Sequence, residues 1–322
     1  MQTKTLIVSC WKFYFLLLTM PGLTSSKCFS TMGKQVVHCT GSITSIKDIY
    51  EEIDPTTSVV VVKDLQKFVI DPNEHLHENF KSLTSYQLSR INDLQLNRNA
   101  FMGLSNLLIM KFADNNINVL ENQIFKGLHS LEILELINCK IKVIDDEAFD
   151  GLSNLQSLDL TNNNIKTISK KLFEFTPNLN SLALYKNEIN NLDVDCFMYL
   201  RKLTTLGLSD NNLQTINAET FNAIPELTYL YVSFNQIDRI LGDFKCPKLK
   251  FINFNHNNLK DVSRNLFKGS NNLKEIDLGF NQINYIDENA FNYLPYLMHL
   301  HLRNCTLDLS KLKFVDKPLI VV

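Results

Sequence analysis

The sequence predicts an α/β repeat solenoid, with a concave parallel β-sheet on one side and irregular or 3-10 segments on the convex side. Phenylalanine recurs in steps of 23 or 24 residues, at Phe101, Phe125, Phe149, Phe173, Phe197, Phe221, Phe244, Phe267 and Phe291. Asparagine is unusually abundant, with 37 of 322 residues, although it favours neither helix nor strand interiors. A chain of 322 residues would otherwise suggest two or three domains, but with a fixed period each unit lengthens one stack.

Each unit has apolar residues at positions 3, 6, 8, 13, 16 and 21, as in SNLLIMKFADNNINVLENQIFKGL from Ser105. Because side chains alternate across a strand, positions 6 and 8 point into a core while positions 5, 7 and 9 face outward. Position 11 ends the strand, and an amide side chain there can bond backbone groups that the turn would leave unpaired. Asparagine fills this position in seven units, at Asn115, Asn163, Asn187, Asn211, Asn235, Asn257 and Asn281, and cysteine fills it in two, at Cys139 and Cys305.

The pattern LxxLxLxx(N/C)xLxxIxxxxFxxL resembles the leucine-rich repeat, in the 24-residue form common in extracellular proteins. It covers residues 105–310 as nine units, which begin at Ser105, His129, Ser153, Pro177, Arg201, Pro225, Pro247, Asn271 and Pro295. The resemblance implies a leucine-rich repeat horseshoe. Its concave sheet would display positions 5, 7 and 9, with position 10 at the edge.

Residues 1–26 have the features of a secretory signal peptide. Lys4 precedes an apolar stretch that Pro21 ends, and small residues stand before the expected cleavage point after Ser26. A membrane anchor is the competing interpretation, but Lys12 interrupts the stretch, which is much shorter than the ~20 residues that span a bilayer. Because no later segment is long enough either, we expect a secreted, extracellular protein without membrane insertion.

A solenoid exposes its core at both ends and needs caps. Residues 27–56 resemble the N-terminal cap of extracellular leucine-rich proteins, reduced from four cysteines to two, and the resemblance implies a disulfide between Cys28 and Cys39. Residues 57–104 are expected to form two degenerate repeats; the stretch 84–104 has only 21 residues and lacks the asparagine of position 11. Residues 311–322 are expected to cover the last repeat, in place of a cysteine-containing cap.

Four further cysteines lie in the repeats. Cys139 and Cys305 are seven units apart, roughly 30 Å at about 4.8 Å per strand, too far for a disulfide. Cys196 stands where other units have alanine or leucine, which predicts a small buried side chain. Cys246 closes the shortened unit from Pro225, so we expect it to be more accessible. A buried free thiol is the simplest interpretation of all four, and an intermolecular disulfide through Cys246 is the alternative.

Signals for chemistry are sparse. The chain has 32 basic and 34 acidic residues, so its net charge of -2 gives no reason to expect nucleic acid as a partner. A phosphate-binding glycine loop, a nucleophile elbow and a CxxC pair are all missing from the sequence. His75 and His77 form one HxH motif and His299 and His301 another. With no carboxylate or thiolate neighbour evident, we expect polar surface there, and neither metal nor cofactor.

Two surface motifs have simple interpretations. The acidic run Asp145-Asp146-Glu147 is expected in a convex turn, as a solvated face and not a calcium site. Asn304-Cys305-Thr306 is the only N-glycosylation sequon, and its central cysteine disfavours modification of Asn304.

The outward positions change character along the chain. From Lys111 to Asp210 they are mainly small or polar, with Tyr185 among the exceptions. The later ones are rich in aromatic, histidine and arginine side chains: Tyr229, Tyr231, Phe234, Phe251, His256, Phe280, His299, His301 and Arg303. Such side chains bury much area at modest entropic cost, so we predict a partner-binding surface. The alternative for Phe234 and Phe280 is ordinary packing against the adjacent loop.

An open sheet offers no pocket for a catalytic constellation, so we expect no enzyme. The leading hypothesis is a secreted binding protein that holds a protein or glycoconjugate partner, an extracellular ligand or receptor, on its concave face. By resemblance, soluble leucine-rich proteins act in innate immunity, as matrix or growth-factor binders, or in adhesion, and short soluble invertebrate ones are the most similar. The alternative is an extracellular-matrix or adhesion scaffold, or a decoy or inhibitor of a receptor, with self-association.

Overall fold

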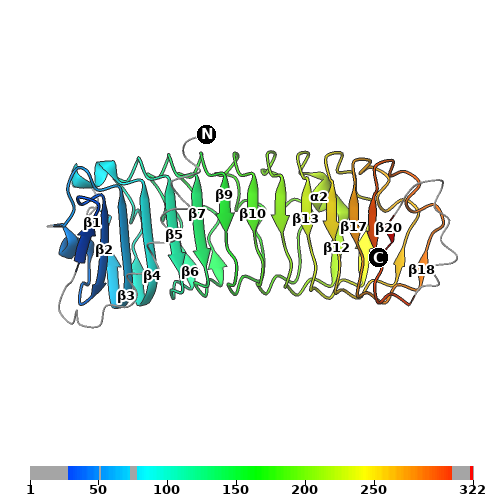
Figure 1. The fold of residues 1–322 in the computed structure, drawn as a ribbon, viewed down its shortest axis with the longest axis horizontal. Helices are drawn as coiled ribbons and strands as arrows, with labels where there is room; N and C mark the ends of the chain where they lie inside the picture. Colours follow the sequence, from blue (N-terminus) through cyan, green and yellow to red (C-terminus); the bar gives the residue numbers. More distant parts are fainter. Residues whose placement is uncertain (1–27, 51, 73–77, 307–319, 322) are drawn as a thin grey trace.

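The computed structural model describes residues 28–50, 52–72, 78–306 and 320–321 (Figure 1). One 14-stranded sheet runs the length of the molecule, and its neighbouring strands are parallel except for the antiparallel pair β1 and β2. In sheet order the strands are β1 (Cys28–Thr31), β2 (Val36–Gly41), β3 (Val59–Ile70), β4 (Ser85–Leu96), β5 (Ile109–Ala113), β7 (Ile133–Ile137), β9 (Ser157–Asp159), β10 (Ser181–Ala183), β11 (Thr205–Gly207), β13 (Tyr229–Tyr231), β15 (Phe251–Asn253), β17 (Glu275–Asp277), β19 (His299–His301) and β20 (Ile320–Val321). The predicted repeat solenoid is confirmed.

The opposite side of the stack is irregular, as predicted, with a few short elements. Three parallel strand pairs lie there: β6 (Val119–Leu120) with β8 (Val143–Ile144), β12 (Thr215–Asn217) with β14 (Arg239–Leu241), and β16 (Asp261–Val262) with β18 (Tyr285–Ile286). The short helices are α2 (Ala218–Asn222) and the 3-10 helices η2 (Ile46–Ile49) and η4 (Glu78–Ser82). None of the helices in the described part of the chain is long and apolar enough to cross a membrane.

The strand register corrects the expected length of one early repeat. β4 pairs with β5 so that Ser85 lies opposite Ile109, a step of one regular 24-residue unit. The unit therefore begins near residue 81, and our count of 21 residues from residue 84 was wrong. It does lack the asparagine, because Ile91 occupies the equivalent of position 11. Asn115 of the next unit bonds this one: its Oδ1 accepts the N–H of Ile91, at 3.1 Å, and its Nδ2 donates to the carbonyl of Leu88, at 2.9 Å.

The recurring phenylalanines form the spine of the core. All nine are buried, and most stack on the equivalent ring of the next unit with centroids 5.7–6.4 Å apart. Leucine and isoleucine of positions 3, 6 and 8 pack against them from the sheet side and are almost fully buried. Each unit thus buries its apolar residues only because its neighbours cover them.

The asparagines of position 11 form the expected ladder between units. The Oδ1 of Asn163 accepts the N–H groups of Cys139 and Ile141, at 3.0 and 3.1 Å. Its Nδ2 donates to the carbonyls of Leu136 and Leu160, at 2.7 and 2.9 Å. Buried amides at Asn187, Asn211, Asn235, Asn257 and Asn281 bond in the same manner. One side chain therefore satisfies backbone groups of two units.

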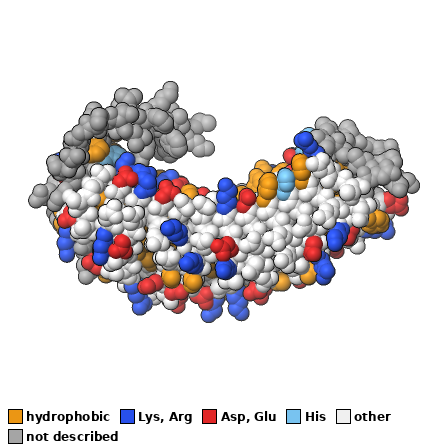
Figure 2. All heavy atoms as spheres, turned by 90° about the horizontal axis from the view of Figure 1, so that it is seen from below, with side chains coloured by type: hydrophobic (Ala, Val, Ile, Leu, Met, Phe, Trp, Pro, Cys, Tyr) orange, Lys and Arg blue, Asp and Glu red, His pale blue; other side chains and the backbone are white. Residues whose placement is uncertain are grey.

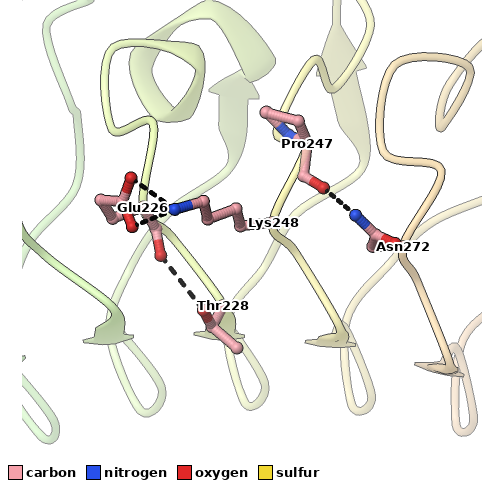
Figure 3. Close-up of polar contacts among 5 residues, drawn as sticks. All are labelled: Glu226, Thr228, Pro247, Lys248 and Asn272. Carbon is pink, nitrogen blue, oxygen red and sulfur yellow. Dashed lines mark hydrogen bonds and ion pairs between the residues drawn. The ribbon is translucent and has the colours of Figure 1, made fainter.

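A second set of polar links, which we did not predict from the sequence, uses position 2 of several units. Asn272 Nδ2 donates to the carbonyl of Pro247, at 2.6 Å (Figure 3). Asparagines at positions 106, 154 and 178 bond the preceding unit in the same way. Lysine takes this place twice: Lys248 Nζ pairs with Glu226, at 2.6 Å (Figure 3), and Lys202 Nζ donates to Asn178 Oδ1, at 2.6 Å. These contacts account for more of the asparagine content.

At the N-terminal end, β1 and β2 form a hairpin that a disulfide between Cys28 and Cys39 closes, with the two Cα atoms 4.1 Å apart. This pairing confirms the disulfide that the resemblance implied. At the other end β20 pairs with β19 as the outermost strand of the sheet. The expected signal peptide, His75 and His77, and most of the expected C-terminal cap lie outside the described residues.

The remaining four cysteines are free, and three of them are buried: Cys139, Cys196 and Cys246. The expectation that Cys246 is the accessible one was wrong. Its side chain lies 1% exposed in the core, and Cys305 is the half-exposed thiol. The shortening of the Pro225 unit leaves the inward direction of Cys246 unchanged, because Phe244 and Leu249 on either side of it are also buried.

We expect iodoacetamide at about pH 8 to modify Cys305 first and to leave the other three thiols of the native protein intact. Burial raises the pKa of all four thiols, to about 12 for Cys139 and Cys246, so the reactive thiolate is scarce, and the half-exposed Cys305 is the one that the reagent can reach. Peptide mass spectrometry identifies the modified sites, and the denatured chain, in which all four thiols react, is the control. Faster modification of Cys246 than of Cys305 would contradict the assignment.

Candidate partner-binding surface

The inner face of the curved stack changes from polar to aromatic toward its C-terminal end. Figure 2 shows hydrophobic and histidine side chains gathered on the inner side of the curve near that end, beside a central region with few of them. The structure brings all nine predicted partner-binding residues onto β13, β15, β17 and β19 or just after these strands. We call them, together with Tyr185, the aromatic surface. Their role in binding stays a prediction.

Part of the aromatic surface lies on the strands themselves. Tyr229 and Tyr231 point outward from β13, and Tyr229 is 40% exposed. The ring of Tyr231 contacts Phe251 of β15, with centroids 5.2 Å apart, and Tyr185 on the other side, at 6.4 Å. Three rings from three different units therefore form a continuous row.

Gly207 makes room for this row. A Cβ atom at this position would lie 2.1 Å from Cζ of Tyr185, so only glycine lets the tyrosine ring cross β11 to reach Tyr231. Burial is the main cause that raises the pKa of Tyr185 to about 12, so its phenol stays protonated. In the sequence Tyr185 is only an exception among polar neighbours. Gly207, a glycine at an outward strand position, was the signal that could have placed Tyr185 in the row.

A second part of the surface lies along position 10, where the strands end. Phe234, His256 and Phe280 form a stack, with both centroid distances 4.2 Å and the planes within 12° of parallel. Arg303 extends it, with its guanidinium carbon 5.7 Å from the centroid of Phe280. Phe234 and Phe280 remain 50% and 37% exposed. Their rings therefore stack with His256 along the strand ends and are not buried against the adjacent loop.

The backbone of this stack is strained. Every residue at position 10 from Asp114 to Asn304 has a left-handed φ, between 52° and 59°. Most of them are aspartate or asparagine, which tolerate that conformation, as histidine does at His256, whereas Phe234 and Phe280 are bulky residues that rarely adopt it. The fold therefore holds two large rings in unfavourable backbone conformations, which is typical of functional sites.

Strands β17 and β19 carry polar side chains that bond each other. His301 Nε2 lies 3.1 Å from Glu275 Oε1, and the rings of His299 and His301 stack with centroids 6.4 Å apart. The expectation that this histidine pair has no carboxylate neighbour was wrong, because Glu275 comes from the preceding unit and only the strand register brings it there. Within the described residues no three histidine, cysteine or acidic side chains are grouped to hold a metal ion.

The other two motifs belong to turns. Asp145 Oδ2 accepts the N–H of Asn122, at 3.2 Å, and Asn122 Oδ1 accepts the N–H of Glu147, at 3.0 Å, so the acidic run links two convex turns. Asn304 is exposed, and Thr306 of its sequon donates its hydroxyl to the carbonyl of Ile283, at 3.0 Å. The disfavoured glycosylation of Asn304 stays a prediction.

Comparison with known proteins identifies the repeat. The family model described as leucine rich repeat matches residues 81–141, 130–184, 177–237 and 247–307, well over half of the chain. Epiphycan of Mus musculus is 48% identical over 48 residues, 15% of each chain. Because this match covers so little of either protein, it supports the repeat pattern and no shared activity.

Among solved structures, the TLR13–ssRNA13 complex has a TM-score of 0.70 at 21% identity, over 82% of this chain and 42% of that one. The glycosylated Toll–Spatzle complex of Drosophila reaches 0.69 at 18% identity, over 88% and 43%. The octameric complex of Latrophilin 3, Unc5D and FLRT2 also reaches 0.69, at 19% identity, over 92% and 91%. The chain thus spans less than half of the first two, and at these identities the likeness is one of fold.

Proposed function

Because the chain belongs to the leucine-rich repeat family, we propose that it is a secreted, non-catalytic protein that binds an extracellular protein partner on the concave face of its C-terminal repeats. The aromatic surface is the observation that carries the proposal. The stack can be built with small or polar residues at the outward positions, as the repeats of β9 and β11 show. The rings at Tyr229, Tyr231 and Phe251 therefore add exposed apolar area without adding to the core.

The strained stack supports the same proposal. Asparagine at position 10 would relieve the backbone at Phe234 and Phe280, as it does at Asn138 and Asn162. Retaining large rings there costs about 1–3 kcal/mol each, and stacking returns only about 0.5–1.5 kcal/mol per pair. A partner that buries the exposed ring edges would offset the remaining strain, since aromatic and arginine side chains carry much of the energy of protein interfaces.

Secretion and the partner class have separate support. The apolar N-terminal stretch and the disulfide between Cys28 and Cys39 suit an oxidising, extracellular environment. Two of the similar structures are complexes between proteins, Toll with Spatzle and Latrophilin 3 with Unc5D and FLRT2, which favours a protein over a glycoconjugate. The Toll–Spatzle complex is a molecular hub in Drosophila development and innate immunity, and this likeness of fold supports our proposal of a role in innate immune recognition.

The test is affinity capture from extracellular fluid with the chain from residue 27 onward. A partner should be retained by the wild-type chain, and the triple variant Tyr229→Ala, Tyr231→Ala, Phe251→Ala should bind it about 100-fold more weakly, because each side chain is a large interface anchor. A second variant, Phe234→Asn with Phe280→Asn, removes rings without straining the backbone and should also weaken binding. Affinities are measured by calorimetry on the captured partner.

Tyr285→Ala is the matched control, because this tyrosine is 57% exposed on β18, away from the concave sheet. It should leave the affinity unchanged. Equal affinity of the wild-type chain and both aromatic variants, with unchanged thermal melts, would exclude the aromatic surface as the binding site. The competing scaffold hypothesis is separated by native mass on a sizing column: a binding protein elutes as a monomer, and a scaffold as larger assemblies.

A further inference from the structure

Arg303 occupies an unusual position in the aromatic surface. Its guanidinium lies over the ring of Phe280, which is itself stacked on His256 and then on Phe234. The arginine side chain is exposed and makes no hydrogen bond or ion pair with any described residue. When a guanidinium lies over an aromatic ring, its planar face contacts the ring. The N–H groups at the edge of the guanidinium remain free to bind a planar anion.

The charges around Arg303 indicate the sign of the missing partner. Two carboxylates face outward from β17, and both already accept hydrogen bonds: Glu275 is 3.1 Å from His301, and Asp277 accepts from Asn255 Nδ2 at 2.8 Å and from the N–H of Gly279 at 3.0 Å. The hydrogen bonds leave both carboxylates charged, but their donors come from the protein itself, whereas the guanidinium of Arg303 has no such partner among the described residues. The free cationic edge of Arg303 therefore calls for an anion from outside.

We propose that the partner presents an acidic peptide segment to the aromatic surface and that Arg303 binds one of its carboxylates through two N–H groups. This inference rests on the proposed function and names the chemistry of the segment that the same surface takes. The segment carries an aspartate or glutamate for Arg303, and apolar or aromatic side chains for the rings of Tyr229, Tyr231 and Phe251. Electrostatic complementarity of this kind selects partners and speeds their encounter.

The probe is a fluorescein-labelled random copolymer of glutamate and tyrosine, and its binding to the full chain is followed by fluorescence anisotropy. We expect binding that weakens as salt is added. Arg303→Gln should weaken it by about tenfold or more, the size expected for a charge-assisted bidentate contact. Arg303→Lys keeps the charge but loses the planar fork, so its affinity for the copolymer should lie between those of the wild type and Arg303→Gln. Arg264→Gln is the control, because Arg264 is exposed in the turn after β16, outside the concave sheet.

Each outcome decides the proposal. Equal binding by the Arg303→Gln and Arg264→Gln variants, equal binding of a lysine–tyrosine copolymer, or no binding of the acidic copolymer at micromolar concentration would overturn it. Binding of heparin that depends on Arg303, without binding of the acidic copolymer, would assign the anchor to a sulfated glycan and overturn the peptide assignment.

The triple alanine variant separates this inference from the proposed function. If Arg303→Gln weakens copolymer binding but the triple variant does not, the carboxylate anchor is supported and the aromatic contact fails. If a captured partner depends on the three rings but not on Arg303, the proposed function is supported and the acidic assignment is overturned. Thermal melts of the Arg303 variants should match that of the wild type, because the arginine side chain is exposed and the ring beneath it is partly exposed as well.

Discussion

Replacement of Phe149 by alanine should lower the free energy of unfolding by about 3–5 kcal/mol. This ring is fully buried in the middle of the stack, between Phe125 at 6.3 Å and Phe173 at 6.4 Å. Its removal leaves a cavity that neither neighbour can fill, because each is held in turn by the next ring of the spine. The loss concerns two interfaces between units, and in a solenoid those interfaces supply the cooperativity.

Urea unfolding followed by circular dichroism measures this effect. Phe149→Leu should cost much less than Phe149→Ala, since leucine still fills most of the space. Tyr285→Ala, which removes an equally large but exposed ring, should change the free energy of unfolding by less than about 1 kcal/mol. A loss from Phe149→Ala as small as that of Tyr285→Ala would mean that the phenylalanine spine does not hold the units together.

Asn163→Ala should cost about 3 kcal/mol or more, even though the side chain is small. The substitution removes four hydrogen bonds of 2.7–3.1 Å and takes the side-chain partner from two buried N–H groups and one carbonyl of the preceding unit. The carbonyl of Leu160 keeps the amide of Asn187, at 3.0 Å. An unpaired buried backbone group costs about 1–3 kcal/mol, and here no water can easily reach the vacated space.

Two further substitutions make this prediction specific. Asn163→Cys should be milder than Asn163→Ala, because cysteine occupies the same position at Cys139, where its thiol donates to the carbonyl of Ile137, at 3.4 Å. Asn154→Ala removes one exposed hydrogen bond of 2.8 Å and should cost less than about 1 kcal/mol. Equal losses from Asn154→Ala and Asn163→Ala would exclude the buried ladder as a main source of stability.

The members of the aromatic surface on β13, β15 and β19 were predictable because outward positions follow from strand alternation, whereas the inclusion of Tyr185 was not. Tyr229, Tyr231 and Phe251 are at positions 5 and 7 of their units, and the alternation of side chains puts these on the concave face. How the rings meet was not predictable. The contact of Tyr185 with Tyr231 depends on the space above Gly207, and the contact of His301 with Glu275 depends on the register of two strands 24 residues apart.

The left-handed backbone at position 10 is a second feature that only the folded chain reveals. Asparagine and aspartate at this place in the early repeats are consistent with such a conformation, but the phenylalanines at Phe234 and Phe280 argue against it. The repeat geometry overrides the local preference, because the parallel strands and, in most units, the asparagine of position 11 force the same turn. That conflict is what marks the stack as a candidate site.

By itself the sequence determined the stack: the period, the inward leucines and phenylalanines and the asparagine ladder all follow from one repeat, since each unit contacts only its neighbours. The tertiary structure decided the contacts between side chains of different units. It buries Cys246, stacks His256 between two phenylalanines and leaves Arg303 on the ring of Phe280 with its N–H edge open. The period specifies which face a residue occupies, but the direction of its side chain depends on neighbours about 24 positions away, and only the assembled stack brings those together.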